Sequence, residues 1–442
     1  MIGKSPNQNQ LNLFKPVLKQ FINPSHPLVL LAERIPWSEL EKDFSPLYSN
    51  TGTPAKPIRL MIGLLLLKQM YNLGDETLMP EWVRDPYFQY FCGEVEFQWR
   101  PPCDPSDLVH FRKRIGTEGV EKLFKLSIDL HGETIKRQRE VIVDTTVQEK
   151  NITFPTDVKL YCKIIGKCNK IAKTEGIVLR QSYRRTVKTL LLLQRFAHHP
   201  KRKKEADRSK RKLKTLAGRI VRDLERKFVE DQMQRYRQEL LIFKAVIAQQ
   251  RFDRDKIYSI HEPETSCIAK GKAHKQYEFG SKVSLAMLPK SNIIVGVLNF
   301  KGNPNDTITL KPTLDYAKKI TGMKFDYAIV DRGYKVKRMI DETEIVIPGR
   351  KENSVYLQNR KRKKCRSRAA IEPIIGHIKS DCRMAKNYLK GRIGDEINSL
   401  MAATAFNFRK LLSKIEKDFI LFIFNLTVKS SKPLNFSVIL SY

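Results

Sequence analysis

Val141-Ile142-Val143-Asp144 is the stretch that decides the fold, a run of β-branched apolar residues that ends on an acid. Such residues favour strands, so the run predicts a buried strand that ends at Asp144. A second run of this kind, Tyr327-Ala328-Ile329-Val330-Asp331, follows much later in the chain. A carboxylate at the end of a buried strand suits a hard cation, which prefers oxygen ligands. The alternative is that each Asp only starts a turn, where Asp is common.

A third acid, Glu372, opens a segment with a helical pattern, preceded by a very basic loop over residues 359–368. At about 100° per residue, Arg368, Glu372 and Lys379 project within roughly 40° of one another on a helix. That face would carry one carboxylate between two cations, while apolar residues at 374–378 anchor the helix. The alternative is an ordinary solvated helix face with an Arg-Glu pair four residues apart.

Several short motifs accompany the three acids. They are, in chain order, Asp144-x-Thr146 with Asn151–Asp157, His261-Glu262-Pro263, 270–272 with 278–283, Gly302–Asp306, Asp331-Arg332-Gly333-Tyr334, and Arg-x3-Glu-x6-Lys at Arg368, Glu372 and Lys379. In this order the motifs resemble those of the DDE transposases of bacterial insertion sequences, within insertion-sequence families four and five. The chain departs from the family pattern at Cys365, where the family often has a Tyr three residues before the Arg.

The order of the elements predicts an RNase H-like domain, a mixed sheet flanked by helices. That topology places the first strand centrally with the fourth beside it, so Asp144 and Asp331 become neighbours and the last helix lays Glu372 across them. The expected elements after the first strand are a hairpin of 277–287 and 292–300, a helix at 307–321, the strand ending at Asp331, a short helix near Val336, a strand at 344–347 and the Glu372 helix.

The resemblance implies DNA cleavage at the ends of an element and transfer of the 3′-OH ends into target DNA. Two Mg²⁺ ions, for which Mn²⁺ can substitute, supply the chemistry of such sites. Asp144 is expected to bridge the ions, with Asp331 on one and Glu372 on the other. The expected contacts to DNA phosphates are Lys379, Arg368, Arg332, Lys361 and Lys363. Double-stranded DNA of the element ends and of the target is the expected partner, bound by a homodimer. An RNase H-like nuclease without strand transfer and a non-catalytic repressor derived from a transposase are the alternatives.

Composition agrees with a nucleic-acid enzyme, since 82 Lys and Arg stand against 47 Asp and Glu, a formal net charge of +35. So basic a chain implies a polyanionic partner, although ribosomal or membrane-surface proteins share this property. The seven cysteines show no CxxC pair, which predicts a reducing compartment without disulfides. The longest apolar runs fall well below the roughly 20 residues of a membrane span, so we expect a cytoplasmic protein with no membrane contact.

Residues 158–257 separate the first strand from the hairpin and predict several amphipathic helices with no strand. The densest charge run of the chain, His198–Lys204 followed by Lys210–Lys214, lies here. It indicates either a solvated helical hairpin or a surface for flanking DNA, target DNA or the partner subunit.

The first 135 residues predict an independent helical region. Helical spacing over Leu60–Tyr71 breaks at Gly74-Asp75-Glu76 and resumes to Phe91, as in a helix-turn-helix, and Asp104-Pro105 predicts a capped helix. Binding of the element ends and a helical scaffold or dimerisation role are both open. We therefore expect a helical region at 1–135, a catalytic domain at 136–157 and 258–412, a basic helical insertion at 158–257 and an irregular tail at 413–442.

Overall fold

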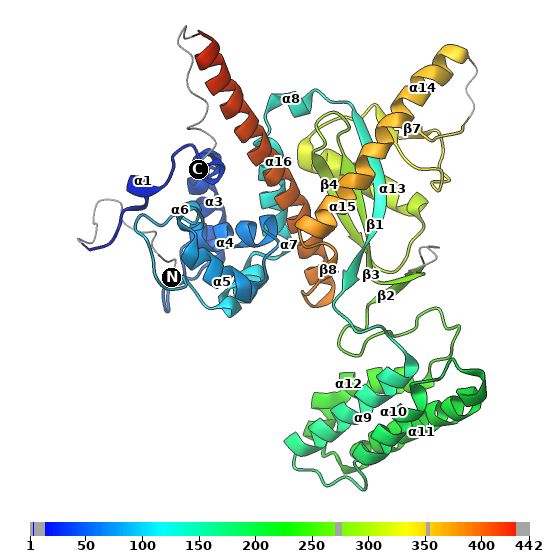
Figure 1. The fold of residues 1–442 in the computed structure, drawn as a ribbon. Coiled ribbons are helices and arrows are strands. Elements are labelled where there is room, and N and C mark those ends of the chain that lie inside the picture. Colours follow the sequence, from blue (N-terminus) through cyan, green and yellow to red (C-terminus); the bar gives the residue numbers. More distant parts are fainter. Residues whose placement is uncertain (1–2, 4–13, 270–275, 351–353, 430–442) are drawn as a thin grey trace.

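The computed structural model describes residues 3, 14–269, 276–350 and 354–429. Figure 1 shows N-terminal helices on one side, a sheet with its own helices on the other, and a helical insertion that lies apart below the sheet. In the part of the chain that is described, no helix is long and apolar enough to cross a membrane. The motif stretch at 270–272 lies outside the described residues.

The sheet is mixed and has the long strand β1 at its centre. β3 runs antiparallel to β1, whereas β5 runs parallel to β1 and β7 parallel to β5. The order over the described residues is β2-β3-β1-β5-β7-β6, with β4 also on β3 and β8 also on β1. The bounds are β1 Glu140–Lys150, β2 Ser266–Ala269, β3 Tyr277–Met287, β4 Ile294–Phe300, β5 Tyr327–Ile329, β6 Met339–Ile340, β7 Thr343–Val346 and β8 Lys386–Asn387.

The predicted hairpin and the predicted pairing of the first strand with the strand before Asp331 are confirmed as β3–β4 and β1–β5. The prediction that the first strand ends at Asp144 is wrong, because β1 continues to Lys150. Its pairing with β5 stops at Ile142, but β3 is long enough to pair with β1 as far as Glu149. The expected helix near Val336 is also absent, since the chain there forms an irregular connection that leads into β6.

Four helices and one short turn complete the sheet domain. α13 packs on β3 and β4, and α14 leads through a 3-10 turn, η3, into α15, which contacts β1. The predicted basic loop is therefore helical, because Ser354 accepts a hydrogen bond from the Leu357 amide and caps a run of helix-favouring Gln, Lys and Arg. The bounds are α13 Asp306–Thr321, α14 Val355–Ser367, η3 Arg368–Ala370, α15 Ile371–Asp381 and α16 Gly391–Lys429. The expected irregular tail is thus wrong as far as residue 429, and residues 430–442 lie outside the described residues.

The N-terminal region is helical as predicted, and Asp104 caps α7 by accepting from the Ser106 amide, with Pro105 in the first turn. The predicted second helix of the helix-turn-helix is two helices, because Asp85 ends α5 and caps α6. The bounds are α1 Leu18–Phe21, α2 Pro27–Arg34, α3 Trp37–Phe44, η1 Ser45–Leu47, α4 Ile58–Met70, α5 Asp75–Arg84, α6 Pro86–Phe91, α7 Pro105–Asp129 and α8 Glu133–Lys136.

The expected independence of this region is wrong, because one hydrophobic core runs from Leu28 through the sheet to Ile415. α16 joins the two parts by packing against α4, α7 and β4. Asn407 on α16 binds the edge of the sheet as a strand would, since its Oδ1 accepts from the Ile294 amide at 3.0 Å and its Nδ2 donates to the Ile294 carbonyl at 2.9 Å. α4 is buried on all sides except at Arg59. It therefore serves as a core helix, and its sides are not open to a DNA groove.

The insertion consists of helices without strands in its described residues, as predicted, and has a hydrophobic core of its own. Asp157 closes its neck, because its carboxylate pairs with Lys210 at 2.7 Å and with Lys256 at 3.1 Å. These two lysines lie on α11 and on the segment that returns to the sheet. The bounds are α9 Asp157–Thr174, α10 Arg184–Gln194, η2 Pro200–Arg202, α11 Lys203–Lys227 and α12 Glu230–Ala248.

Candidate active site

Three carboxylates from separate elements surround the guanidinium of Arg368. Its Nη2 lies 3.4 Å from Oδ2 of Asp144, in the middle of β1, and 4.0 Å from Oδ2 of Asp331, just after β5. Its Nη1 lies 3.4 Å from Oε1 of Glu372, in the first turn of α15. One cation therefore joins Asp144 to two acids that follow it by 187 and 228 residues in the chain.

Asp144 is the most enclosed of the three acids, with its side chain 15% exposed. Burial raises the pKa of Asp144 to about 6, and the negative charges of Asp331 and Asp306 add to this. The Thr145 amide, which donates to Oδ1 at 2.8 Å, and the charge of Arg368 act in the opposite direction on that pKa. The Thr145 amide and the positive charge of Arg368 therefore favour the ionised form of a carboxylate whose burial favours the protonated form.

The other two acids are more open to solvent. The Asp331 side chain is 36% exposed, and its Oδ1 accepts from the Gly333 amide at 2.8 Å, so Asp331 both starts a turn and faces the site. Glu372 is 66% exposed at the start of α15. The two interpretations of Asp331, turn residue and site residue, are thus compatible.

A fourth carboxylate, Asp306, stands behind Asp144 and was given no role from the sequence. Its Oδ1 accepts from the Thr145 hydroxyl at 2.7 Å and pairs with Nζ of Lys282 at 2.6 Å. Tyr334 is buried near these acids, and burial raises its pKa. The signal was present in the Gly302–Asp306 motif, where Asn305 and Asp306 begin α13, but only the fold brings that motif to β1.

The other predicted site residues fall into two groups. Arg332 lines a groove together with Cys365, Arg368 and Glu372. Lys363 is exposed on α14, and Lys379 is half-buried on α15. Lys361 is placed differently from the prediction of a DNA contact, since it is 9% exposed and its Nζ donates to the Arg350 carbonyl at 2.6 Å. Lys361 therefore supports the wall of the groove and does not present its charge to solvent.

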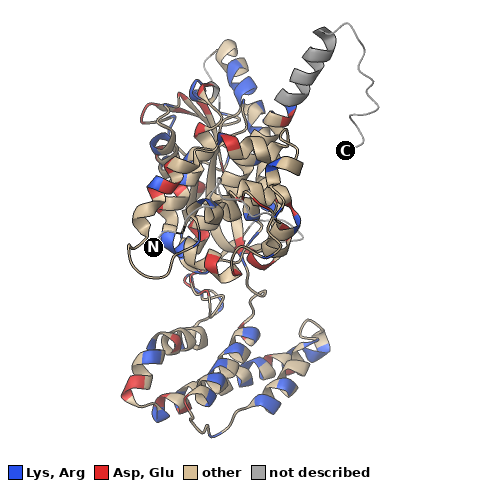
Figure 2. Ribbon diagram, turned by 90° about the vertical axis from the view of Figure 1, so that its left-hand side faces the viewer, with Lys and Arg blue, Asp and Glu red and all other residues tan. Residues whose placement is uncertain are grey.

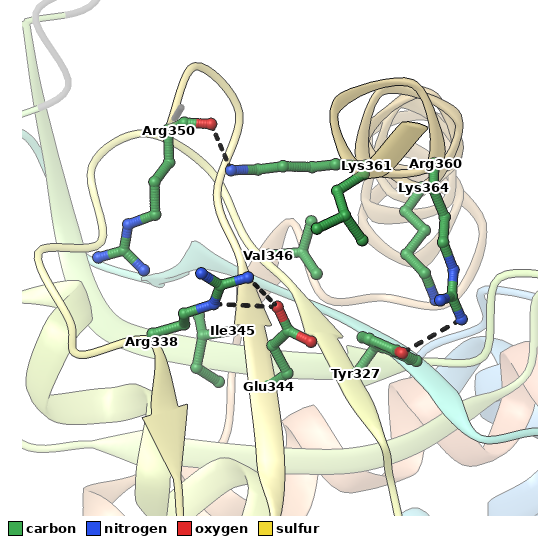
Figure 3. A pocket seen from close by; sticks show the side chains of 10 residues that line it. Tyr327, Arg338, Glu344, Ile345, Val346, Arg350, Arg360, Lys361 and Lys364 are labelled. Carbon is green, nitrogen blue, oxygen red and sulfur yellow. Dashed lines mark hydrogen bonds and ion pairs between the residues drawn. The ribbon is translucent and has the colours of Figure 1, made fainter. Parts of the chain in front are cut away.

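A second pocket lies on the other side of α14, against β5 and β7, and Figure 3 shows its lining. Its cations have partners inside the protein: Arg338 pairs with Glu344, and Lys364 pairs with Glu140 while lying over the Tyr327 ring. These contacts fasten α14 to the sheet, and none of the three site acids lines the pocket. We therefore regard it as structural.

The residues present fit a divalent cation by their chemistry, because all three site acids offer carboxylate oxygens. Within the described residues, no group of three or more His, Cys, Asp or Glu side chains is close enough to hold a metal ion. The Arg368 guanidinium stands between the acids instead. Holding an ion there therefore requires Arg368 to turn aside and the acids to draw together.

Two family models match the chain. The family described as Transposase domain (DUF772) matches residues 16–114, and the family described as Transposase DDE domain matches residues 256–408. The chain belongs to the DDE transposases of the insertion-sequence type. Members of this family generally use divalent metal ions and act on DNA.

Part of the chain is also similar to a relative whose name gives no function. The uncharacterized protein ORF8 in the nfe locus of Rhizobium meliloti is 42% identical over 198 residues, which cover 44% of this chain and 96% of that protein. No solved structure matches the chain. The DDE match includes Asp331 and Glu372 but begins after Asp144 and after most of the insertion. The family model therefore does not cover Asp144, and its inclusion among the site acids of this DDE transposase rests on the place of β1 beside β5 and on the contact of Asp144 with Arg368.

Proposed function

We propose that this protein cuts DNA at the ends of its own insertion element and transfers the freed 3′-OH ends into target DNA. Asp144, Asp331 and Glu372 are the catalytic carboxylates of this proposal, carried by an RNase H-like domain. The observation that carries it is the meeting of the three acids at Arg368, although they come from β1, the end of β5 and α15. The strand order β4-β3-β1-β5-β7 supports the domain type, because β3 pairs antiparallel with β1 whereas β5 pairs parallel with it.

In the proposed mechanism Asp144, Asp331 and Glu372 would together hold two Mg²⁺ ions, or Mn²⁺ in their place, and Asp144 would contribute its carboxylate to both. Bound divalent ions of this kind activate a water or 3′-OH nucleophile and stabilise the leaving oxygen. The backbone positions the acids: β1 holds Asp144 rigidly in the sheet, and the Gly333 amide orients Asp331. Asp144 must be ionised to bind a cation, so the activity should decline as the pH falls below about 6.

The cations around the site would hold the phosphates of the DNA. Arg368 is the counterion of the three acids in the free protein and would bind a DNA phosphate when divalent cations occupy the acids. Arg332 lines the same groove as Glu372, and Lys379 follows on the helix of Glu372. Lys363 is exposed on α14 but does not line this groove, so its contact with DNA would lie farther from the acids. A homodimer is part of the proposal, because two element ends must be joined in one complex.

An assay of cleavage and joining tests the proposal. The purified full chain is incubated with a duplex that carries the end of its own element, a target plasmid and Mg²⁺. Asp144→Asn should reduce both steps by at least about 100-fold, because losing a metal ligand exceeds the effect of losing its outer partners. Asp315→Asn, at an exposed position of α13, is the matched control and should retain activity.

Each remaining outcome decides against part of the proposal. Joining by Asp144→Asn at the rate of the unmodified protein would refute the role of this carboxylate. Cleavage without joining by the unmodified protein would favour the nuclease. Specific binding to the element end with neither reaction would favour the repressor.

A further inference from the structure

The insertion holds most of the excess positive charge of the protein. Residues 158–257 contain 29 Lys and Arg against 10 Asp and Glu, a net charge of +19 out of +35. The rest of the chain uses several of its cations to line the active site and to fasten α14, whereas the insertion lies apart from that site (Figure 1). Figure 2 shows Lys and Arg recurring along the helices of the insertion.

On α11 the cations are arranged in a row. Six basic residues and one Thr are spaced by three or four residues, so on a helix they share one face within roughly 80°. All seven are exposed. The opposite face of α11 carries Leu213, Ile220 and Leu224, which are buried in the core of the insertion. The row, which we call the α11 ridge, consists of Lys204, Arg208, Arg211, Thr215, Arg219, Arg222 and Arg226.

The ridge is not neutralised by acids along most of its length. α11 carries four acids, none of them a member of the ridge. Glu205 and Asp207 are exposed near its start, Asp223 is buried and pairs with Arg226 and Lys227, and Glu225 pairs with Lys244 on α12. Arg226, at 3.7 Å from Asp223, is the ridge residue with an ion pair within the described residues. An unneutralised row of arginines at the surface is a binding surface for a polyanion.

The length of the ridge matches double-stranded DNA. From Lys204 to Arg226 is 22 residues of helix, or about 33 Å at 1.5 Å per residue. One turn of B-DNA is about 34 Å, and the duplex carries one negative charge per about 1.7 Å of its axis. The ridge offers five guanidinium groups, one ammonium and one hydroxyl, all of which can bind phosphates. It has no Asn, Gln, Asp or Glu that could accept from a base, so we expect contacts mainly to the phosphates. A second copy of the chain is an unsuitable partner, because the chain outside 158–257 is itself positive, with 53 Lys and Arg against 37 Asp and Glu.

We propose that the α11 ridge is a second DNA-binding surface, separate from the active site, which holds the sugar-phosphate backbone of duplex DNA without regard to sequence. This proposal rests on the proposed function, because it takes DNA as the substrate. In it, the insertion binds DNA that lies outside the cleaved position. Binding there raises the total number of phosphate contacts and therefore the salt dependence of duplex binding.

The test measures binding of the full chain to a labelled duplex that lacks the element end, with a chelator present so that no cleavage occurs. Arg211→Gln, Arg219→Gln and Arg222→Gln are combined in one variant. Three lost phosphate contacts should make the negative slope of log K against log salt shallower by about 2.7. The loss of affinity relative to the unmodified protein should therefore be about 40-fold larger at 50 mM than at 200 mM salt.

The matched control removes the same charge from the same insertion. Lys170, Lys173 and Lys188 line the groove between α9 and α10. The combined variant Lys170→Gln, Lys173→Gln and Lys188→Gln should change the slope by less than about 0.9, the value for one phosphate contact. An unchanged slope in the ridge variant, or equal changes in both variants, would overturn the proposal. Glutamine favours helices, so circular dichroism should show unchanged helix content in the triple variant. If the triple variant misfolds, the single Arg219→Gln tests the same point, with an expected change of about 0.9 in the slope of log K against log salt.

The two proposals fail separately. If the unmodified protein neither cuts nor joins element ends, the proposed function is refuted, while the ridge is still judged by the slopes. If it cuts and joins but the ridge variant binds duplex DNA normally, only the ridge is refuted.

Discussion

Replacing Asp144 by Asn should remove a pH-dependent destabilisation of the free protein. Burial raises the pKa of Asp144 from its usual 3.8 to about 6 in the folded chain. The folded protein therefore binds a proton here more tightly than the unfolded chain. Stability from this group is fully present below about pH 4 and is lost as the pH rises through about 6. An asparagine side chain at this position is similar in shape, can still accept from the Thr145 amide and does not titrate.

The size of the effect follows from the shift in pKa. About two pKa units correspond to about 3 kcal/mol at 1.36 kcal/mol per unit. The stability of Asp144→Asn relative to the unmodified protein should therefore increase by about 3 kcal/mol between pH 4 and pH 7 and then level off. All other titrating groups are shared by the two proteins, so their contributions largely cancel in this difference.

Tryptophan fluorescence during urea unfolding is a suitable measurement, with a chelator present. Trp37 and Trp82 are buried in the core that the N-terminal helices share with the sheet, and the insertion contains no Trp. The signal thus reports the part of the protein that holds the site. A difference in unfolding free energy that stays flat from pH 4 to pH 8 would show that the Asp144 carboxylate is not desolvated, and the reasoning about this site would be wrong.

Three further changes test the contacts that hold the site and the fold. Arg368→Ala removes a charge that lowers the pKa of Asp144, so the midpoint of the pH-dependent change in unfolding free energy should move above 6. Arg368→Lys retains the charge and should keep this midpoint near 6. Equal midpoints in the two variants would contradict the role of this charge. Lys150→Met removes the ammonium that lies 3.2 Å from the buried Glu262 and 2.9 Å from the buried Asp395. The loss should lower the free energy of unfolding in urea by about 3 to 5 kcal/mol at pH 7, and by less at pH 5. The exposed Lys386→Met is the control, and a loss below about 1 kcal/mol would be inconsistent with a buried ion pair. Asn407→Leu removes the side-chain partners of the Ile294 amide and carbonyl and should lower the free energy of unfolding by on the order of 3 kcal/mol, measured by the same Trp signal. No change in stability would mean that α16 does not cap the sheet through this residue.

The sequence predicted those elements whose local pattern and tertiary role agree. The β3–β4 hairpin, α13, the capped start of α7 and the strand-free insertion all follow from local pattern or turn chemistry. The errors occurred where distant contacts decide. β1 continues past Asp144 because β3, more than 130 residues later, supplies its partner. The basic run at 359–368 is a helix, since positively charged residues do not exclude one when a cap and a supporting sheet are present.

The sequence by itself determined the identity of the three acids, the order of the elements that carry them and the excess of positive charge, because residue chemistry and short-range periodicity are local properties. Only the tertiary structure decided that the acids meet at Arg368, that Asp306 stands behind Asp144, that Lys361 is buried, and that the N-terminal helices and the sheet share one core. The first two depend on β1 lying between β3 and β5, a pairing of segments far apart in the chain. The burial of Lys361 depends on its contact with the Arg350 carbonyl, and the shared core depends on the packing of α16. The apolar residues before Asp144 predict a buried strand, but the extent of burial that raises the pKa of Asp144 arises only from the pairing of β1 with β3 and β5.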